Sequence, residues 1–420
     1  MSYGITPNDF SAVAKTDSEA IRLAVAAAKE TGEDRVVIPR KNLRTGKNVW
    51  EIDSAILLPS DIEIVLDNCT LRQADGCFDN VFRTAVTDTE ERGRRSARQR
   101  NVHLTGRGNA VIDGGVHNGL TEKTSLKNGL PHVSKNNMIL FTNLESFSIT
   151  GITFRDMRWW ALQLVFVSEG RLRDLTFDAR DNVPNQDGID LRVGCHNITV
   201  ENVTGYAGDD LIALSGFSGA ERRHGYWVEG MASDISNVRI RNVIGTSVTK
   251  AVIALRNNDG ILLRDIDIDG VTDLSGNGAR KSAPYAVVRI GQKYYGSLRF
   301  SKMGETSRIS VRNVFAAHGD AVMVNVTLDN AVFENLFLGE EAKSAFTTRS
   351  DWKASGASLR NVTVRGVFCD AANRSPLPLV ELVRVEEDEY LENVRITEVS
   401  APAERQLLHN EFLSGLTTDL

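Results

Sequence analysis

The chain has 420 residues and a formal net charge of −6. This charge gives no reason to expect nucleic acid or an anionic membrane as a partner, and aromatic and basic residues are not interleaved in a nucleic-acid-binding pattern. The four cysteines lack the spacing of metal ligands and are expected to be buried free thiols, so neither a metal nor a cofactor is predicted.

The first predicted element is an amphipathic, alanine-rich helix over residues 17–31, with Thr16 or Asp17 as N-cap and Gly32 as terminator. We expect residues 1–40 to cover an open apolar end of the following structure. The chain shows no signal peptide and no transmembrane run. As it stands it is predicted to be cytoplasmic, and it is predicted to be secreted if a leader was removed.

A six-residue pattern then recurs along the chain, with an apolar residue on each side of a polar bend. The bend residues are Asn68, Gly151, Asp174, Asn202, Asn242, Asp265, Asn313, Asn335, Asn361 and Asn393. From Ile149 onward the repeats start 23, 28, 40, 23, 48, 22, 26 and 32 residues apart. A base period near 23 with loop insertions is typical of a solenoid. Asn and Asp tolerate the left-handed backbone of a tight bend, and Asn side chains can hydrogen-bond from coil to coil.

Short runs rich in Val, Ile, Leu and Phe between the bends read as strands. After most bends a second strand is predicted, at Ala161–Val167, Gly188–Val193, Asp210–Gly216, Ala251–Asn257, Ala286–Gly291, Ala321–Val326 and Pro378–Val385. The predicted fold is all-β: a right-handed single-stranded parallel β-helix with an N-terminal capping α-helix. No linker is visible, so residues 1–420 are predicted to form one domain, with coils over about 50–400 and a C-terminal tail or cap at 401–420. Homo-oligomer formation is left open.

Three carboxylates occur at the entrances to two successive strands. Asp187 precedes Asp209 by 22 residues, close to one period, and Asp210 follows directly. Stacked coils lie about 4.8 Å apart, so the three side chains are expected to share one patch. Like charges this close raise at least one pKa, and one protonated carboxyl beside one ionised carboxylate is the equipment of glycoside hydrolysis. The alternative is that these acids are ordinary turn residues.

The stretch Asn185-Gln186-Asp187-Gly188 followed by Gly208-Asp209-Asp210 resembles the Asn-Thr-Asp and Gly/Gln-Asp-Asp motifs of the polygalacturonase family, glycoside hydrolase family 28. Residues 8–39 also resemble the opening of pectin-degrading β-helix enzymes. The resemblance implies an inverting hydrolase in which Asp209 is the general acid and Asp187 and Asp210 hold and activate water. Inversion requires acid and base about 6.5–9.5 Å apart.

Two further motifs of that family are absent. Thr249-Lys250-Ala251-Val252 stands where the family has Gly-His-Gly, and residues 284–289 replace Arg-Ile-Lys. The acid/base half of the family's motif set is therefore present, and the half that grips the substrate is rewritten.

Candidates for substrate binding are basic and aromatic residues on or beside the same rungs. They are Arg192, Lys250, Arg256 and Arg289 for an acidic group on a sugar, His224 in an insertion, and Trp160, Trp227 and Tyr294 for sugar faces. The alternatives are that the cations neutralise the neighbouring carboxylates and that the aromatic rings pack within loops.

Three functions compete at this stage, all with a carbohydrate as partner. The first is a glycoside hydrolase, inverting and acting on a uronic or otherwise anionic saccharide. The second is a lyase or epimerase on uronates, in which the three aspartates bind calcium and Lys250 is the base. The third is a non-catalytic, tail-spike-like sugar-binding solenoid.

Overall fold

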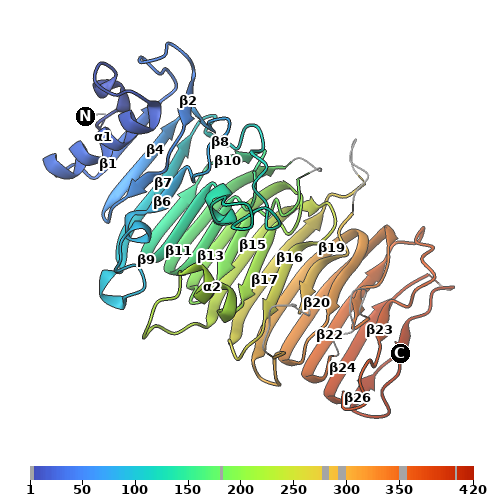
Figure 1. Cartoon of the computed structure of the whole chain (residues 1–420). Coiled ribbons are helices and arrows are strands. Elements are labelled where there is room, and N and C mark those ends of the chain that lie inside the picture. The colour runs from blue at the N-terminus through green and yellow to red at the C-terminus, as the bar shows by residue number, and fades with distance from the viewer. Residues whose placement is uncertain (1–3, 180–182, 277–282, 292–298, 350–356, 403) are drawn as a thin grey trace. The chain divides into compact units, whose positions relative to one another are not determined.

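The computed structural model describes all residues except 1–3, 180–182, 277–282, 292–298, 350–356 and 403 (Figure 1). The chain divides into two compact units, one formed by residues 1–190 with 224–231 and the other by residues 191–223 with 232–420. The expectation of a single domain over residues 1–420 stays a prediction.

The first unit begins with helical segments and continues as strands. Its elements are η1 (Pro7–Phe10), α1 (Asp17–Thr31), β1 (Arg35–Pro39), β2 (Val49–Ile52), β3 (Ile56–Leu58), β4 (Ile62–Asp67), β5 (Thr70–Gln73), β6 (Phe82–Thr84), η2 (Ala85–Asp88), η3 (Arg95–Ala97), β7 (Gln99–Arg107), β8 (Val111–Asp113), η4 (Val133–Asn136), β9 (Ile139–Thr150), β10 (Thr153–Arg155) and β11 (Leu162–Asp178). Here η denotes a short 3-10 helix. The next strand, β12 (Ile189–Arg192), begins in the first unit and ends in the second.

The second unit consists almost entirely of strands. Its elements are β13 (His196–Ala207), β14 (Ile212–Gly216), α2 (Ser218–His224), β15 (Ile235–Ser247), β16 (Ala251–Asn257), β17 (Leu263–Asp273), β18 (Ala286–Ile290), β19 (Thr306–Val324), β20 (Leu328–Ala342), β21 (Phe346–Thr347), β22 (Leu359–Cys369), β23 (Val380–Leu382), β24 (Leu391–Ser400), β25 (Leu408–Asn410) and β26 (Leu416–Thr418). The last residue of α2 belongs to the first unit.

Strands of successive coils pair in parallel, as the repeat predicts. In the first unit one stack runs β1, β4, β7, β9 and β11, and a second runs β2, β5, β8, β10 and β11. In the second unit one stack runs β13, β15, β17, β19, β20, β22, β24 and β26, and another runs β14, β16, β18, β19, β21, β23 and β25. Figure 1 shows β20, β22, β24 and β26 of the second unit side by side. The predicted parallel β-helix is confirmed.

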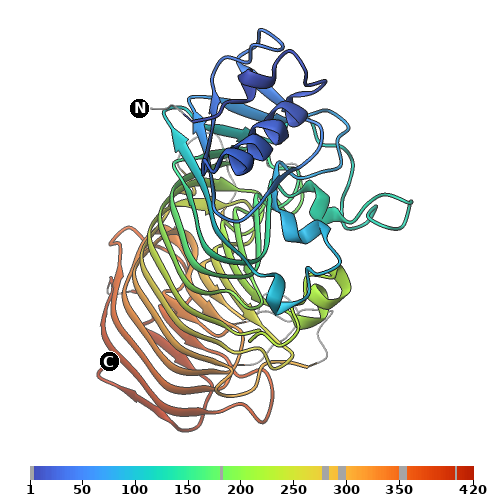
Figure 2. The same cartoon turned by 90° about the vertical axis from the view of Figure 1, so that its left-hand side faces the viewer.

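The N-terminal helix is confirmed at the predicted residues. The Thr16 side chain accepts a hydrogen bond from the Glu19 amide at 3.1 Å, and Gly32 ends the helix in the left-handed conformation at φ 76°. The face that contains Ile21 and Val25 is buried, and the helix packs against β1, β2 and β3 (Figure 2). It therefore covers the first coil.

All ten predicted bend residues have a positive φ, from 51° to 69°. In the second unit the bends also bond from coil to coil: Asn242 donates to Asn202 at 2.9 Å and Asn335 to Asn313 at 3.0 Å. Each bond gives a partner to the side-chain amide of an Asn whose own backbone forms the bend. The bends therefore both turn the chain and tie the coils together.

The predicted second strands are present, several with other boundaries: 161–167 and 321–326 coincide with the start of the longer β11 and the end of the longer β19, and 378–385 is shortened to β23. Strand β14 begins at Ile212 and not at Asp210. The Asp210 side chain accepts the hydrogen bond from the Ala251 amide, which a backbone carbonyl would accept in regular strand pairing. Strand pairing also continues beyond residue 400, where β25 pairs with β23 and β26 with β24. All four cysteines are free, and Cys69 and Cys195 are buried.

Within the described residues, none of the helices combines the length and apolar character that a membrane crossing needs.

Candidate active site

Asp187 lies in the first unit, directly before Gly188 and β12. Its main-chain carbonyl accepts a hydrogen bond from the Ala161 amide at 2.9 Å. The preceding Gln186 is fully buried and donates from Nε2 to the Met157 carbonyl at 2.6 Å, while Asn185 adopts φ 58°. The Asp187 side chain is only 2% exposed. The backbone that presents this carboxylate is therefore fixed from both sides.

Asp209 and Asp210 lie in the second unit, directly before β14. The Asp209 carbonyl accepts a hydrogen bond from the Ser247 hydroxyl at 2.6 Å, and the same hydroxyl accepts from the Lys250 amide at 2.9 Å. Asp210 accepts from the Ala251 amide at 3.0 Å through Oδ1. The next coil therefore fixes both acids through its own backbone.

The two neighbouring acids have different surroundings. Asp210 is buried, and its Oδ2 lies 3.0 Å from the Arg256 guanidinium. Asp209 is only partly buried, and its pKa is raised to about 6 by desolvation and by the negative charge of Asp210, against the opposing effect of Lys250 and Arg256. The prediction that crowding raises the pKa of at least one acid is confirmed for Asp209. Near pH 6 it holds a proton for about half of the time.

Whether Asp187 shares one pocket with Asp209 and Asp210 stays a prediction, because Asp187 belongs to the first unit and the other two to the second.

The four predicted cations have distinct environments. Arg256 (on β16) pairs with Asp210, as the neutralising alternative predicts, and Lys250 is half-buried directly before the same strand. Arg192 is 5% exposed and bonds through Nε to Glu221 of α2 at 2.7 Å. Arg289 is 3% exposed on β18, the neighbour of β16. Lys250 and Arg256 are therefore partly exposed, whereas Arg192 and Arg289 are buried.

The predicted aromatic and histidine residues of the first unit pack against other rings. Trp160 lies 6.0 Å from buried Trp159, and Trp227 meets Phe166 edge to face at 5.4 Å. His224 lies 4.0 Å from His132. These rings have structural contacts, and their predicted contact with sugar stays a prediction. Tyr294 lies outside the described residues.

Sequence reasoning missed Glu221, which is fully buried and holds Arg192. This ion pair ties α2 to the end of β12, and the Arg192 guanidinium also lies 5.7 Å from the Phe217 ring. No repeat register connects α2 with β12, because the helix sits in an insertion between coils. The signal for this ion pair would have been the burial of a charged residue within the insertion, and burial cannot be read from a sequence.

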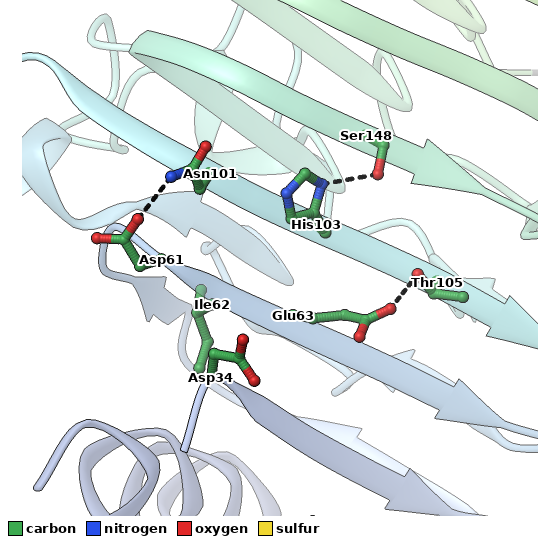
Figure 3. A pocket seen from close by; sticks show the side chains of 8 residues that line it. All are labelled: Asp34, Asp61, Ile62, Glu63, Asn101, His103, Thr105 and Ser148. Atoms are coloured by element: carbon green, nitrogen blue, oxygen red, sulfur yellow. Dashed lines mark hydrogen bonds between the residues drawn. The ribbon is translucent and has the colours of Figure 1, made fainter. Parts of the chain in front are cut away.

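A separate acidic pocket of about 500 Å³ lies in the first unit (Figure 3). Its lining includes Asp34, Asp61 and Glu63, together with neutral polar residues of β7 and β9. Asp61 accepts from Asn101 at 2.6 Å, and Glu63 accepts from Thr105 at 2.8 Å. None of the predicted site residues lines this pocket.

A protein-family model matches the part of the chain that contains Asp187, Asp209 and Asp210. Residues 64–230, which contain all three predicted catalytic aspartates, match the model of the family described as glycosyl hydrolases family 28. The predicted resemblance to this polygalacturonase-like family is confirmed over that stretch. No curated protein sequence matches the chain.

Solved structures show the same fold at low sequence identity. The endo-xylogalacturonan hydrolase of Aspergillus tubingensis is 15% identical, with TM-score 0.54 and coverage of 96% of this chain and 95% of that one. A tailspike protein of E. coli bacteriophage HK620, solved with a pentasaccharide, is 13% identical, with TM-score 0.64 and coverage of 99% and 80%. The A-module of mannuronan C-5 epimerase AlgE6 of Azotobacter vinelandii is 12% identical, with TM-score 0.54 and coverage of 99% of each chain.

At these identities the three structures establish the fold alone, and fold does not fix activity. Residues 64–230 match the family 28 model, and within that stretch parallel strands such as β9 and β11 belong to the parallel β-helix.

Proposed function

We propose that the protein is an inverting glycoside hydrolase that cleaves a glycosidic bond in an oligo- or polysaccharide with uronic or otherwise anionic sugars. The observation that carries the proposal is the contrast within the Asp209–Asp210 pair. Asp209 has a pKa raised to about 6, while its neighbour is paired with a guanidinium. One carboxyl that retains its proton beside one held as a carboxylate is the division of labour that glycoside hydrolysis needs.

In the proposed reaction Asp209 gives its proton to the glycosidic oxygen as the bond to the anomeric carbon breaks. Asp210 and Asp187 hold a water on the opposite face of the sugar and take one of its protons as its oxygen bonds to that carbon. The anomeric configuration inverts. Asp209 is then ionised, and the carboxylate that accepted the proton of the water is protonated. Solvent restores the starting state. The requirement for Asp187 to face this water rests on the family motif.

An anionic sugar is proposed because cationic side chains adjoin the two acids. Lys250 directly precedes the strand that carries Arg256, and Lys250 is half-buried. Two adjacent residues of α2, Arg222 and Arg223, are exposed. A carboxylate or sulfate on the substrate suits guanidinium and ammonium donors.

Asp209→Asn tests the assignment of the acid. We expect kcat to fall by about 10²–10⁴-fold, because an amide cannot protonate the leaving group, while substrate binding and the unfolding midpoint change little. Glu392→Gln, at an exposed position of β24, is the matched control and should retain full activity. Activity of Asp209→Asn within a few-fold of the parent would remove Asp209 as the acid.

The first product identifies the reaction class. Its anomeric form, read by NMR on a panel of defined oligosaccharides, should be the opposite of the bond cleaved. Retained configuration would contradict inversion. An unsaturated sugar that absorbs in the ultraviolet, formed in a chelator-sensitive reaction, would indicate a lyase. Binding without any product would indicate a sugar-binding solenoid.

A further inference from the structure

A second pocket, of about 440 Å³, lies in the second unit near the C-terminal coils. Two loops form it, one after β22 and one after β24. Its lining consists of Ala371, Asn373, Arg374, Ser375, Pro376, Pro402, Glu404 and Arg405. No residue assigned to the proposed reaction lines it. Its size lies within the range of small-molecule sites.

Arg405 is buried in the wall of this pocket with an exposed fraction of 8%. Its guanidinium donates to two main-chain carbonyls, those of Ser375 and Lys343. Nε is buried without a hydrogen-bond partner, and across the described residues Arg405 forms no ion pair. Burial lowers the pKa of Arg405, the direction expected for a cation removed from water without a compensating carboxylate.

Nearby acidic groups do not supply the missing negative charge. The Cys369 thiol acts electrostatically on Arg405, but burial raises the pKa of this thiol, so it remains neutral near pH 7. Glu404 lines the pocket but is exposed, and in the described part of the chain it has no ion pair with either arginine. A buried cation is costly unless it is paired.

Arg374 supplies a second guanidinium on the other loop. It donates only to the main-chain carbonyls of Ala371 at 2.7 Å and Asn373 at 3.1 Å, and among the described residues it pairs with no carboxylate. Its loop is anchored by Asn373, which is 2% exposed and donates to the Gly339 and Ala342 carbonyls at 2.7 and 2.9 Å. Arg374 and Arg405, from two different loops, therefore line the same cavity.

Arg158 of the first unit is a buried guanidinium that donates to main-chain carbonyls through its two terminal nitrogens, and its Nε, like that of Arg405, has no hydrogen-bond partner. It is 1% exposed and donates to three carbonyls, those of Gln73, Ala74 and Cys77. Arg405 has two such carbonyls and adjoins an open cavity that also contains Arg374. The arrangement around Arg405 leaves room and donors for an anion.

We infer that this pocket binds an oxyanion, with Arg374 and Arg405 as its charged donors and a carboxylate or sulfate borne by a sugar as the group it takes. Planar guanidinium groups bind such oxyanions through paired hydrogen bonds. The inference concerns binding only and assigns no reaction to the pocket. The inference does not depend on the proposed hydrolysis, and Asp209→Asn should bind at this pocket as the parent does.

Calorimetric titration of the full-length protein at constant ionic strength tests the inference, with glucuronate, glucose, and inorganic sulfate as probes. We expect saturable binding of glucuronate, none of glucose, and at least a ten-fold weaker Kd for glucuronate in Arg374→Gln. Saturation by sulfate with the same dependence on Arg374, but not by glucuronate, would support the oxyanion site with a free inorganic anion as its source. Equal binding in the parent and Arg374→Gln, or no binding of either anion, would overturn the inference.

Three further variants guard against a structural explanation. Arg374 and Arg395 are both exposed, so Arg395→Gln is a matched control that should bind like the parent. Glu404→Gln should tighten binding about two- to five-fold, because it removes a negative charge from the lining. Arg405→Gln should abolish binding, and its unfolding midpoint shows whether the fold survives. Unchanged affinity in Glu404→Gln together with unchanged affinity in Arg374→Gln would contradict the proposed site.

Discussion

Two buried aspartates of the second unit, Asp210 and Asp320, occupy equivalent positions in the coil stack and have partners of the same kind. Asp210 aligns with Ala251, Ala251 with Ala286, and Ala286 with Asp320. Asp210 accepts the next coil's amide at 3.0 Å and pairs with Arg256. Asp320 likewise accepts the Ser344 amide at 3.0 Å and pairs with Arg349. We call a buried aspartate that accepts an amide hydrogen from the next coil and pairs with an arginine a clamp. The fold contains two such clamps, three coils apart.

The two clamps differ in the residue that precedes each aspartate. Asp209 precedes Asp210 and is partly exposed. Gly319 precedes Asp320 at φ 70°, where an added Cβ would lie 2.4 Å from the Pro284 carbonyl oxygen. The second clamp has no room for another acid at that position. The clamp is therefore a structural device, and the added, accessible carboxylate is what distinguishes the proposed catalytic region.

A raised pKa alone does not identify a catalytic acid in this protein. Burial raises the pKa of Asp320 to about 6, as high as that of Asp209, yet Asp320 is completely buried. A group that cannot reach a substrate cannot protonate one. Exposure beside a second carboxylate, and not the pKa alone, marks Asp209 as the candidate acid.

The largest effect on stability is expected from Arg349→Met. Arg349 pairs with both Asp320 and Glu381, and its loss leaves two buried carboxylates without a cation. We expect unfolding to become easier by about 3 kcal/mol at pH 8. The cost should be smaller at pH 5, because Asp320, with a pKa of about 6, is then mostly protonated and uncharged.

Denaturant unfolding of Arg349→Met at both pH values measures this difference, with exposed Arg395→Met as the control. The sign follows from linkage: the native state binds the Asp320 proton more tightly than the unfolded state, so this group's contribution to stability falls as pH rises from about 4 to 6. Turnover well below the unfolding temperature should be unchanged. A loss of turnover without unfolding would show that the second clamp has a direct part in catalysis.

A mixed effect is expected from Arg256→Met at the first clamp. Asp210 loses its guanidinium, and we expect a stability loss of about 2 kcal/mol. The Arg256 charge also lowers the pKa of Asp209, so its removal should raise that pKa and move the alkaline limb of the kcat–pH profile, which we place near pH 6, to higher pH. An unshifted limb in a folded Arg256→Met variant would separate Asp209 from the titration that controls turnover.

The repeat made the coil stack predictable, because each bend needs a left-handed backbone and the sequence supplies Asn, Asp or Gly there. Asn242 and Asn335 show this: each has a positive φ and bonds to the bend of a neighbouring coil. The backbone positions of Asp209 and Asp210 followed from the same register. The rise in the pKa of Asp209 has burial as its largest cause, which the register does not encode, and the adjacent charge of Asp210 as its second.

Partners reached through insertions were not predictable. Arg192 was named as a substrate ligand or as a partner of nearby carboxylates. Its carboxylate partner is Glu221 on α2, which lies in an insertion without register to the coils, and its contact with substrate stays a prediction. Arg256 was named as a substrate ligand or as a neutralising partner, and only its rotamer decides which carboxylate it reaches. Side-chain geometry of this kind depends on packing that periodicity does not encode.

The smallest effect is expected from Lys250→Gln, which removes a charge without removing a clamp. Lys250 lowers the pKa of Asp209 through its positive charge, so the alkaline limb of the kcat–pH profile should move to higher pH. Stability should be nearly unchanged, because Lys250 is only half-buried. If Lys250 also binds the substrate's acidic group, KM should rise for an anionic saccharide and stay constant for a neutral one. Lys250→Arg retains the charge and should restore the parent profile; a shifted limb in that variant would show that ammonium geometry, and not charge, sets the behaviour of Asp209.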